Sequence, residues 1–171
     1  RQVQCLATFV DPATGEPRVA CVDGRKVSIY DPVAGGAALV VIKASSSFGS
    51  VKALAFFKDP ATGEPRLACA CGDGTARVYD PVAGGEALLV LDIGSDVDAL
   101  ALFVDKTAAP RLACGSEDGK VRVFDAIAGG KALLVLGMGD EVKSLAVFKD
   151  PATGAPRLAC GTTELDEDGD E

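Results

Sequence analysis

The chain has 171 residues, of which 48% are hydrophobic and 25% charged, a balance typical of a folded protein of about one domain. Its 25 acidic and 17 basic residues give a net charge of -8, which argues against nucleic acid as a partner, because phosphate binding needs clustered lysine and arginine. No apolar run approaches the roughly 20 residues of a membrane span, so we expect no membrane partner.

The sequence repeats itself at intervals of about 45 to 48 residues, which is typical of stacked structural units. The repeats align on an arginine that follows a proline, at Arg18, Arg66, Arg111 and Arg157. The first unit is expected to begin with a strand at residues 3–11. The last is expected to stop after its second strand, at residues 157–163.

The second unit shows the expected strands most clearly. Four apolar stretches of strand length follow one another, at residues 51–59, 66–74, 75–80 and 87–94. The turn sequences PATGEP, DG and PVAGG separate them. Asp-Gly between apolar stretches favours a tight hairpin, because both residues tolerate a positive φ. The unit therefore predicts four antiparallel strands.

The second strand of this unit is apolar on both faces. Leu67, Cys69 and Cys71 alternate with Ala68 and Ala70, so that neither face would be left for water. Stacking of sheets face to face buries both sides, and small side chains allow a close approach. Four-stranded blades arranged around an axis satisfy this requirement.

The segments RLACACGDGTARVYD and RLACGSEDGKVRVFD resemble the second half of a WD40 repeat, whose familiar form is LASGSDDGTVRVWD. The resemblance covers three units and the first two strands of a fourth. It implies an all-β, WD40-like β-propeller built of four-stranded antiparallel blades. Tyr30, Tyr79 and Phe124 replace the family's tryptophan, and the Gly-His step is missing. The hydrogen-bonded tetrad of many family members therefore cannot form. A β-solenoid is the alternative fold.

We place the propeller repeats in residues 1–163, with units at about 3–50, 51–96, 97–141 and a partial 142–163. Residues 164–171, ELDEDGDE, lack the spacing of a calcium loop, and we expect a disordered acidic tail there. Three complete repeats and a half blade fall short of the four to eight blades of most propellers. Three readings stay open: a fragment of a longer propeller, a half-ring that dimerises, or a small strained closure within one chain.

Catalysis has little support in the sequence. Histidine is absent, which removes the usual general base and the commonest metal ligand, and no GxxxxGK phosphate loop occurs. Asp96 and Asp98 are paired carboxylates, but alternate residues near the start of a strand more often serve a turn. We expect no enzyme activity, no cofactor and no metal site.

The positions of the cysteines indicate the redox compartment of the cell in which the protein resides. Four of the six cysteines occupy the same place in successive units, where they would lie one blade apart. We interpret them as small buried thiols in a reducing compartment, and so expect an intracellular, cytoplasmic protein. These cysteines are Cys21, Cys69, Cys114 and Cys160.

One face of the expected disc carries the variable loops. The PATGEP and PVAGG turns are almost unchanged between units and share the other face, which is typical of scaffold. The variable loops concentrate acid, with Lys52, Lys120 and Lys143 nearby. We expect this face to receive a basic protein surface or peptide; solvated turn residues are the alternative. The acidic candidates are Asp92, Asp96, Asp98, Glu117, Asp118, Asp140 and Glu141.

The fourth strands, at residues 38–42, 87–91 and 132–136, lack polar alternation and would form adhesive edges. One expectation is that they accept a strand from a partner or from a second copy of the chain, which could form a homodimer that completes the ring. The alternative is that neighbouring loops cover them. The edge-pairing candidates are Leu39, Val41, Leu88, Val90, Leu133 and Val135.

The sequence therefore predicts a non-catalytic protein-protein interaction scaffold. Two alternatives stay open: a ligand-binding or enzymatic propeller with its site in the central channel, and a self-assembling repeat module with no other function.

Overall fold

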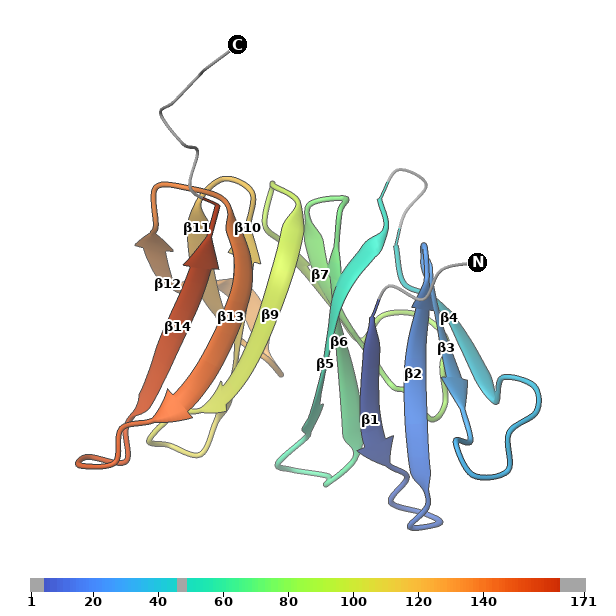
Figure 1. Cartoon of the computed structure of the whole chain (residues 1–171). Coiled ribbons are helices and arrows are strands. Elements are labelled where there is room, and N and C mark those ends of the chain that lie inside the picture. Colours follow the sequence, from blue (N-terminus) through green and yellow to red (C-terminus); the bar gives the residue numbers. More distant parts are fainter. Residues whose placement is uncertain (1–4, 46–48, 164–171) are drawn as a thin grey trace.

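The computed structural model describes residues 5–45 and 49–163, and every regular element within them is a β-strand. The strands form three four-stranded antiparallel sheets and one two-stranded sheet, which stand side by side like the blades of a propeller (Figure 1). The all-β propeller architecture is therefore confirmed, and the β-solenoid alternative is wrong.

Each sheet is a meander in which consecutive strands pair. Blade 1 consists of β1 (Leu6–Val10), β2 (Pro17–Asp23), β3 (Lys26–Tyr30) and β4 (Val40–Lys43). Blade 2 consists of β5 (Val51–Lys58), β6 (Pro65–Cys71), β7 (Thr75–Tyr79) and β8 (Leu89–Asp92). Blade 3 consists of β9 (Val97–Val104), β10 (Pro110–Ser116), β11 (Lys120–Asp125) and β12 (Gly129–Gly137). Half-blade 4 consists of β13 (Val142–Lys149) and β14 (Pro156–Thr162).

Turn chemistry explains how the strands are joined. The Asp-Gly turns between second and third strands place Gly24, Gly74 and Gly119 at φ 64, 80 and 72°, where a side chain would be strained. At the opposite end, Asp59 Oδ1 accepts a hydrogen bond of 2.9 Å from the Ala61 N–H and starts the PATGEP turn. The predicted hairpins are thus confirmed.

The recurrent arginine of each repeat clamps this second kind of turn. In blade 3, Arg111 contacts Asp105 in the turn and Asp125 at the end of β11, both at 2.7 Å. In half-blade 4, Arg157 contacts Asp150 at 2.9 Å. The arginine therefore ties the turn between the first two strands to the sheet.

Apolar clusters fill the spaces between blades. One cluster joins Ile29 and Ile42 of blade 1 to Leu67 and Tyr79 of blade 2, and a second joins Val78 and its neighbours of blade 2 to blade 3. As predicted, both faces of β6 are covered; the Leu67 face lies against blade 1 and the Ala68 face against blade 3. Each fully buried leucine or isoleucine contributes about 1.5–3 kcal/mol, so the interfaces between blades hold the sheets together.

The repeated cysteines differ in burial, contrary to the prediction that all four are buried. Cys69 and Cys114 are 0% exposed, and burial raises the pKa of Cys114 to about 12. Cys21 and Cys160 are only half-buried. Cys21 lies on the face of blade 1 that no other blade covers, and Cys160 lies in a sheet that has two strands. All six cysteines are free thiols.

The blades form an open arc. The inner strands contact one another in the order β1, β5, β9 and β13, and Figure 1 shows β1 and β13 at opposite ends of this row. A small ring closed within this chain is therefore not what the structure shows. Among the described residues, there is no helix of the length and apolarity that a membrane crossing needs.

Candidate functional site

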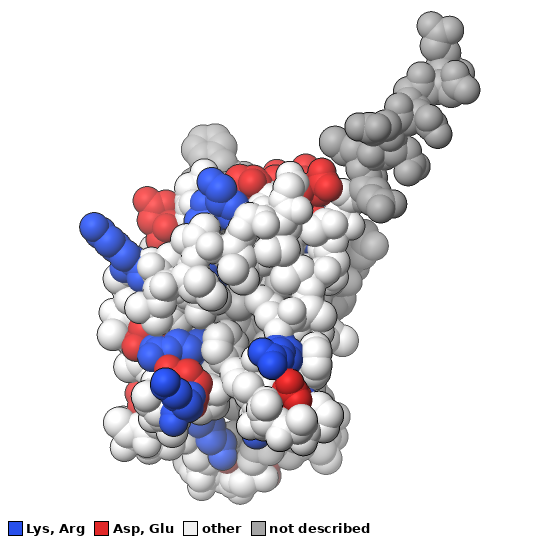
Figure 2. All heavy atoms as spheres, turned by 90° about the vertical axis from the view of Figure 1, so that its left-hand side faces the viewer, with Lys and Arg blue, Asp and Glu red and all other residues white. Residues whose placement is uncertain are grey.

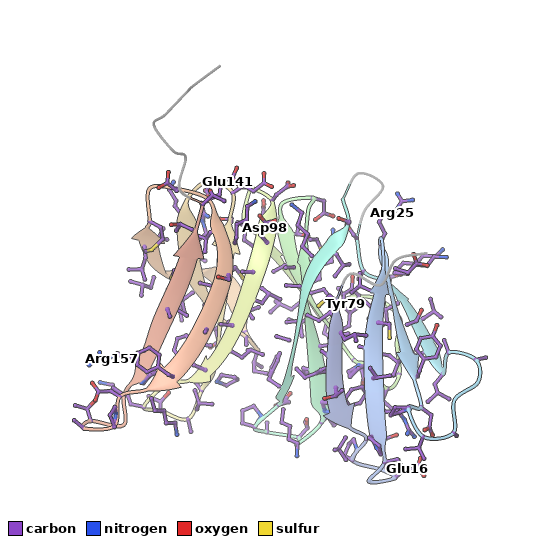
Figure 3. All side chains as sticks on the ribbon, viewed as in Figure 1. Glu16, Arg25, Tyr79, Asp98, Glu141 and Arg157 are labelled. Carbon is purple, nitrogen blue, oxygen red and sulfur yellow. The ribbon has the colours of Figure 1, made fainter. Side chains whose placement is uncertain are left out.

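The predicted acidic residues gather at one end of the blades. Figure 3 shows Asp98 and Glu141 at the upper end, whereas Glu16 and Arg157 lie at the lower end with the PATGEP turns. Acidic side chains also line the upper edge of the space-filling view (Figure 2). We call this surface the acidic face, formed by Asp92, Asp96, Asp98, Glu117, Asp118, Asp140 and Glu141.

An ion-pair chain crosses the acidic face from blade 2 to half-blade 4. Lys52 Nζ of β5 lies 2.7 Å from Asp98 Oδ1 of β9, and Lys143 Nζ of β13 lies 2.5 Å from Asp98 Oδ2. The three residues occupy the same place in successive repeats, each directly after a buried valine. The side chain of Asp98 is only 7% exposed, so Asp98 is an internal ion-pair partner and presents little surface to a partner protein.

Three further carboxylates surround the two lysines. Lys52 contacts Asp96 at 3.3 Å and Glu117 at 3.2 Å, and Lys143 contacts Glu141 at 2.9 Å. Partial burial by itself lowers the pKa of Lys52, but hydrogen bonds to the carboxylates outweigh it and raise that pKa. Burial likewise favours the neutral form of Asp98, yet the two lysines hold its pKa below the usual range. Lys52 and Asp98 are therefore both charged at neutral pH.

Asp118 is held by a partner that the sequence analysis missed. Arg122 Nη2 donates to Asp118 Oδ2 at 2.6 Å, and the Ser116 hydroxyl donates to Asp118 Oδ1 at 2.6 Å. The hydrogen bond from Arg122 lowers the pKa of Asp118 to about 2. Arg77 pairs with Asp73 in the same way, at 2.8 Å. The sequence signal that could have predicted these ion pairs is an arginine four residues after the turn aspartate, on the other strand of the Asp-Gly hairpin.

A hollow of about 330 Å³ opens between blade 3 and half-blade 4 on the acidic face. Glu117, Asp118, Asp140 and Glu141 line it, together with Gly139 and Thr163. Asp140 is exposed and makes no ion pair with the described residues, and the same holds for Asp92 at the end of β8. Of these two carboxylates, Asp140 therefore lines the hollow and Asp92 does not.

The edge-pairing candidates lie on the outer rim, uncovered. Leu39 and Leu88 directly precede β4 and β8, and the other four lie within the fourth strands. The six side chains are 51–59% exposed, so the expectation that neighbouring loops cover them is wrong. They are Leu39, Val41, Leu88, Val90, Leu133 and Val135.

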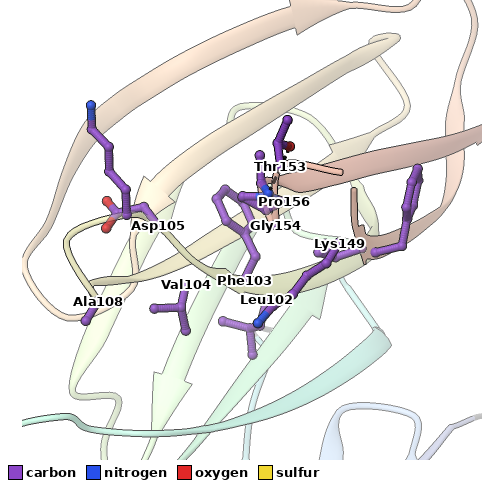
Figure 4. Close-up of a pocket in the computed structure, with 13 residues that line it drawn as sticks. Leu102, Phe103, Val104, Asp105, Ala108, Lys149, Thr153, Gly154 and Pro156 are labelled. Atoms are coloured by element: carbon purple, nitrogen blue, oxygen red, sulfur yellow. Dashed lines mark hydrogen bonds between the residues drawn. The ribbon is translucent and has the colours of Figure 1, made fainter. Parts of the chain in front are cut away.

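A second, larger groove lies between blade 3 and half-blade 4, and Figure 4 shows residues that line it. It has a volume of about 980 Å³ between β9 and β13, and Leu102, Phe103, Val147 and Phe148 contribute its apolar lining. Asp105, at its edge, is bound to Thr107 and Arg111, and these hydrogen bonds lower its pKa to about 2. In the described part of the chain, no group of three or more His, Cys, Asp or Glu side chains is arranged so that it could hold a metal ion.

Comparisons with known proteins agree with the blade geometry. Residues 39–80 match the WD40 family, described as WD domain, G-beta repeat. No curated protein matches the sequence. Among solved structures, the chain is similar to Sqt1 from Saccharomyces cerevisiae, with a TM-score of 0.74 and 17% identity. The match covers 92% of this chain and 43% of that one, so the chain spans less than half of its length.

These findings agree with the four-stranded blades and with the repeated RLAC and Asp-Gly segments. WD40 propellers are typically non-catalytic platforms for binding other proteins. Because the matched WD40 repeat sits in an array of structurally equivalent blades, the chain has the fold of a partial WD40-like β-propeller.

Proposed function

We propose that this chain is a non-catalytic interaction scaffold whose acidic face receives a basic surface or peptide of a partner protein. The hollow lined by Glu117, Asp118, Asp140 and Glu141 is the observation that supports this proposal. A concave site with excess carboxylate favours a lysine or arginine side chain, whose donors form charge-assisted hydrogen bonds.

The two lysines that pair within the acidic face limit how much it contributes to partner binding. Lys52 and Lys143 neutralise part of the charge and connect adjacent blades. Asp92 and Asp140, which make no ion pair with any residue that the structure describes, are exposed. Exposed ion pairs are worth only about 0.2–1 kcal/mol each. The acidic face therefore contributes mainly to the rate of association and to partner selection, both of which weaken with salt.

A matched pair of charge reversals tests the proposal. Asp140→Lys places a cation at the hollow, whereas Glu86→Lys makes the same change in net charge in the loop between β7 and β8. Neither residue has an ion pair within the described residues, so both variants should fold. The probe is a fluorescent peptide of alternating arginine and glycine, and the readout is fluorescence anisotropy at two salt concentrations.

We expect Asp140→Lys to weaken peptide binding at least fivefold at low salt, and Glu86→Lys to weaken it less than twofold. High salt should reduce the difference. Equal weakening by the two variants would show that only net charge matters, and would contradict a specific acidic face. The intracellular location inferred from the cysteines belongs to this proposal, and the six free thiols support it.

A further inference from the structure

The groove between β9 and β13 lies beside two turns that depart from the repeat. The first turn, residues 105–109, follows β9, and the second, residues 150–155, follows β13. Both turns lie at the end of the blades opposite the acidic face (Figures 1 and 3). Each wall of the groove is a complete hairpin, β9 with β10 and β13 with β14. The groove is therefore formed by two neighbouring hairpins of the described chain.

The apolar lining lies where an aromatic pair of the repeat is incomplete. Between blades 1 and 2, the rings of Phe9 and Phe56 are in contact, with their centroids 4.6 Å apart. The register of the inner strands makes Phe103 and Val147 the equivalent pair between blade 3 and half-blade 4. Both belong to the apolar cluster of that interface, and both line the groove. Valine has no ring to place against Phe103, so apolar surface of that ring faces the groove.

The same two turns carry fewer acidic residues than the PATGEP turns of blades 1 and 2. Ala109 and Ala155 stand where those turns have Glu16 and Glu64, each directly before the recurrent proline and arginine. The turn after β9 is also one residue shorter, and Lys106 follows its aspartate where the other turns have proline. In a chain of net charge -8, these departures make the surroundings of the groove locally positive.

The carboxylates of the two turns are engaged inside their own hairpins. Asp105 contacts Arg111 at 2.7 Å, and Asp150 contacts Arg157 at 2.9 Å. The Oδ1 atom of each aspartate also accepts a hydrogen bond from a backbone N–H of its turn, at 2.8 and 2.9 Å. The aspartates therefore brace the turns, and neither forms an ion pair with a lysine.

Two lysines line the groove, and neither has an ion pair within the described residues. Lys106 lies in the turn after β9 and Lys149 at the end of β13, and both are exposed. Lys149 shares the face of β13 that carries Val147, because alternate residues of a strand point to the same side. Figure 4 shows its side chain extending toward Leu102. An apolar surface between two such ammonium groups fits a ligand that carries apolar side chains between carboxylates.

The open shape of the groove favours a segment of another protein over a small molecule. Sites for small molecules enclose most of the ligand, within about 300–1,000 Å³. This groove has about 980 Å³, but Val104 in its lining is 58% exposed, so that a small ligand would stay largely in water. A protein segment needs less enclosure, because the rest of its own chain holds it in position.

We propose that the groove between β9 and β13 is a docking site for a short acidic segment of a partner protein, with one or two large apolar side chains between its carboxylates. The apolar side chains pack on Phe103 and Val147, and the carboxylates pair with Lys106 and Lys149. The site shares no residue with the acidic face and takes a ligand of opposite charge. It therefore does not rest on the proposed function above.

The probe is a panel of fluorescent six-residue peptides, and binding to the full chain is followed by fluorescence anisotropy at two salt concentrations. Each peptide begins with Asp-Glu and ends with Asp-Glu, and its two central positions hold every combination of leucine, phenylalanine and serine. The peptide with two serines keeps every charge but has no apolar side chain. It is the control for attraction by charge alone.

Matched variants of the chain locate the site. Lys149→Glu reverses a charge in the groove, whereas Lys58→Glu makes the same change at the equivalent position of blade 2. Both lysines are exposed and have no ion pair within the described residues, so both variants should fold. Val147→Phe supplies the ring that Phe56 supplies between blades 1 and 2, and should occupy the apolar part of the groove. Thermal unfolding checks that this variant is folded.

We expect saturable one-to-one binding by peptides that contain leucine or phenylalanine. Binding should weaken at least fivefold with Lys149→Glu or Val147→Phe, and less than twofold with Lys58→Glu. The peptide with two serines should bind at least tenfold more weakly than the best member of the panel. Asp140→Lys should change binding less than twofold, so failure of the acidic-face proposal can be told apart from failure of this one.

Four results would overturn the proposal. Three of them are the absence of saturable binding by every peptide, equal binding of the double-serine and apolar peptides, and equal effects of the two lysine variants. The fourth comes from dodecanoate, added as a competitor. If dodecanoate binds more tightly than every peptide, the groove is a site for a small amphipathic anion and not for a protein segment.

Discussion

Asp98 Oδ2 lies 2.5 Å from Lys143 Nζ, and this contact joins the inner strand of blade 3 to that of half-blade 4. The other oxygen of Asp98 lies 2.7 Å from Lys52 Nζ of blade 2. One carboxylate with little exposed surface therefore links three successive blades.

Replacing this shared carboxylate should destabilise the chain. Asp98→Asn leaves two ammonium groups facing a neutral amide, so we expect the free energy of unfolding to fall by roughly 1–3 kcal/mol. Asp96→Asn removes a carboxylate whose side chain is 40% exposed, and should cost less than about 1 kcal/mol. Denaturant unfolding of both variants measures the difference. Equal losses would show that Asp98 does not organise the face.

Acid should destabilise the Asp-Gly hairpin of blade 3. The bond from Arg122 lowers the pKa of Asp118 to about 2 in the folded chain, below the value of about 3.9 in an unfolded one. The stabilisation is therefore complete above about pH 4 and is lost as the pH falls toward about 2. Melting temperatures between pH 5 and 2 should fall less steeply for Asp118→Asn than for the parent. Parallel curves would contradict the prediction.

The turn between β9 and β10 holds an alanine where its equivalents hold glycine. Ala108 has φ 65°, close to the 73° of Gly63, and a left-handed conformation costs alanine about 1–2 kcal/mol. Glycine's greater freedom in the unfolded chain offsets about 0.5–1 kcal/mol of this. Ala108→Gly should therefore stabilise the chain by about 0.5–1 kcal/mol in thermal unfolding, and Gly63→Ala should destabilise it. Destabilisation by Ala108→Gly would refute this account.

Equivalent cysteines should react at different rates. Native-state alkylation at pH 8.5 should modify the half-buried Cys21 and Cys160 well before Cys69 and Cys114, which are 0% exposed. Mapping of modified peptides by mass spectrometry gives the order. Simultaneous modification of Cys114 and Cys160 would contradict the burial described here.

Local sequence determined the strands and turns of this protein. Asp-Gly and PATGEP impose their hairpins through the backbone preferences of a few adjacent residues, and the two apolar faces of β6 require a sheet on each side. The burial of Tyr79 between two blades could also be predicted, because an interface between blades is where an aromatic side chain at the end of a third strand can be buried.

Only the tertiary structure decided which copies of a repeated residue are buried and which charges meet. Cys114 and Cys160 lie in two copies of the same segment, RLACG, yet they differ in exposure. The strand that carries Cys114 has a third strand beside it, whereas the strand that carries Cys160 has none among the described residues. Lys52, Asp98 and Lys143 meet although they are far apart in the chain, because stacking brings equivalent positions of successive inner strands together. Burial and ion pairing depend on the residues of the neighbouring blade, and the sequence of a single repeat does not specify which blade lies beside it.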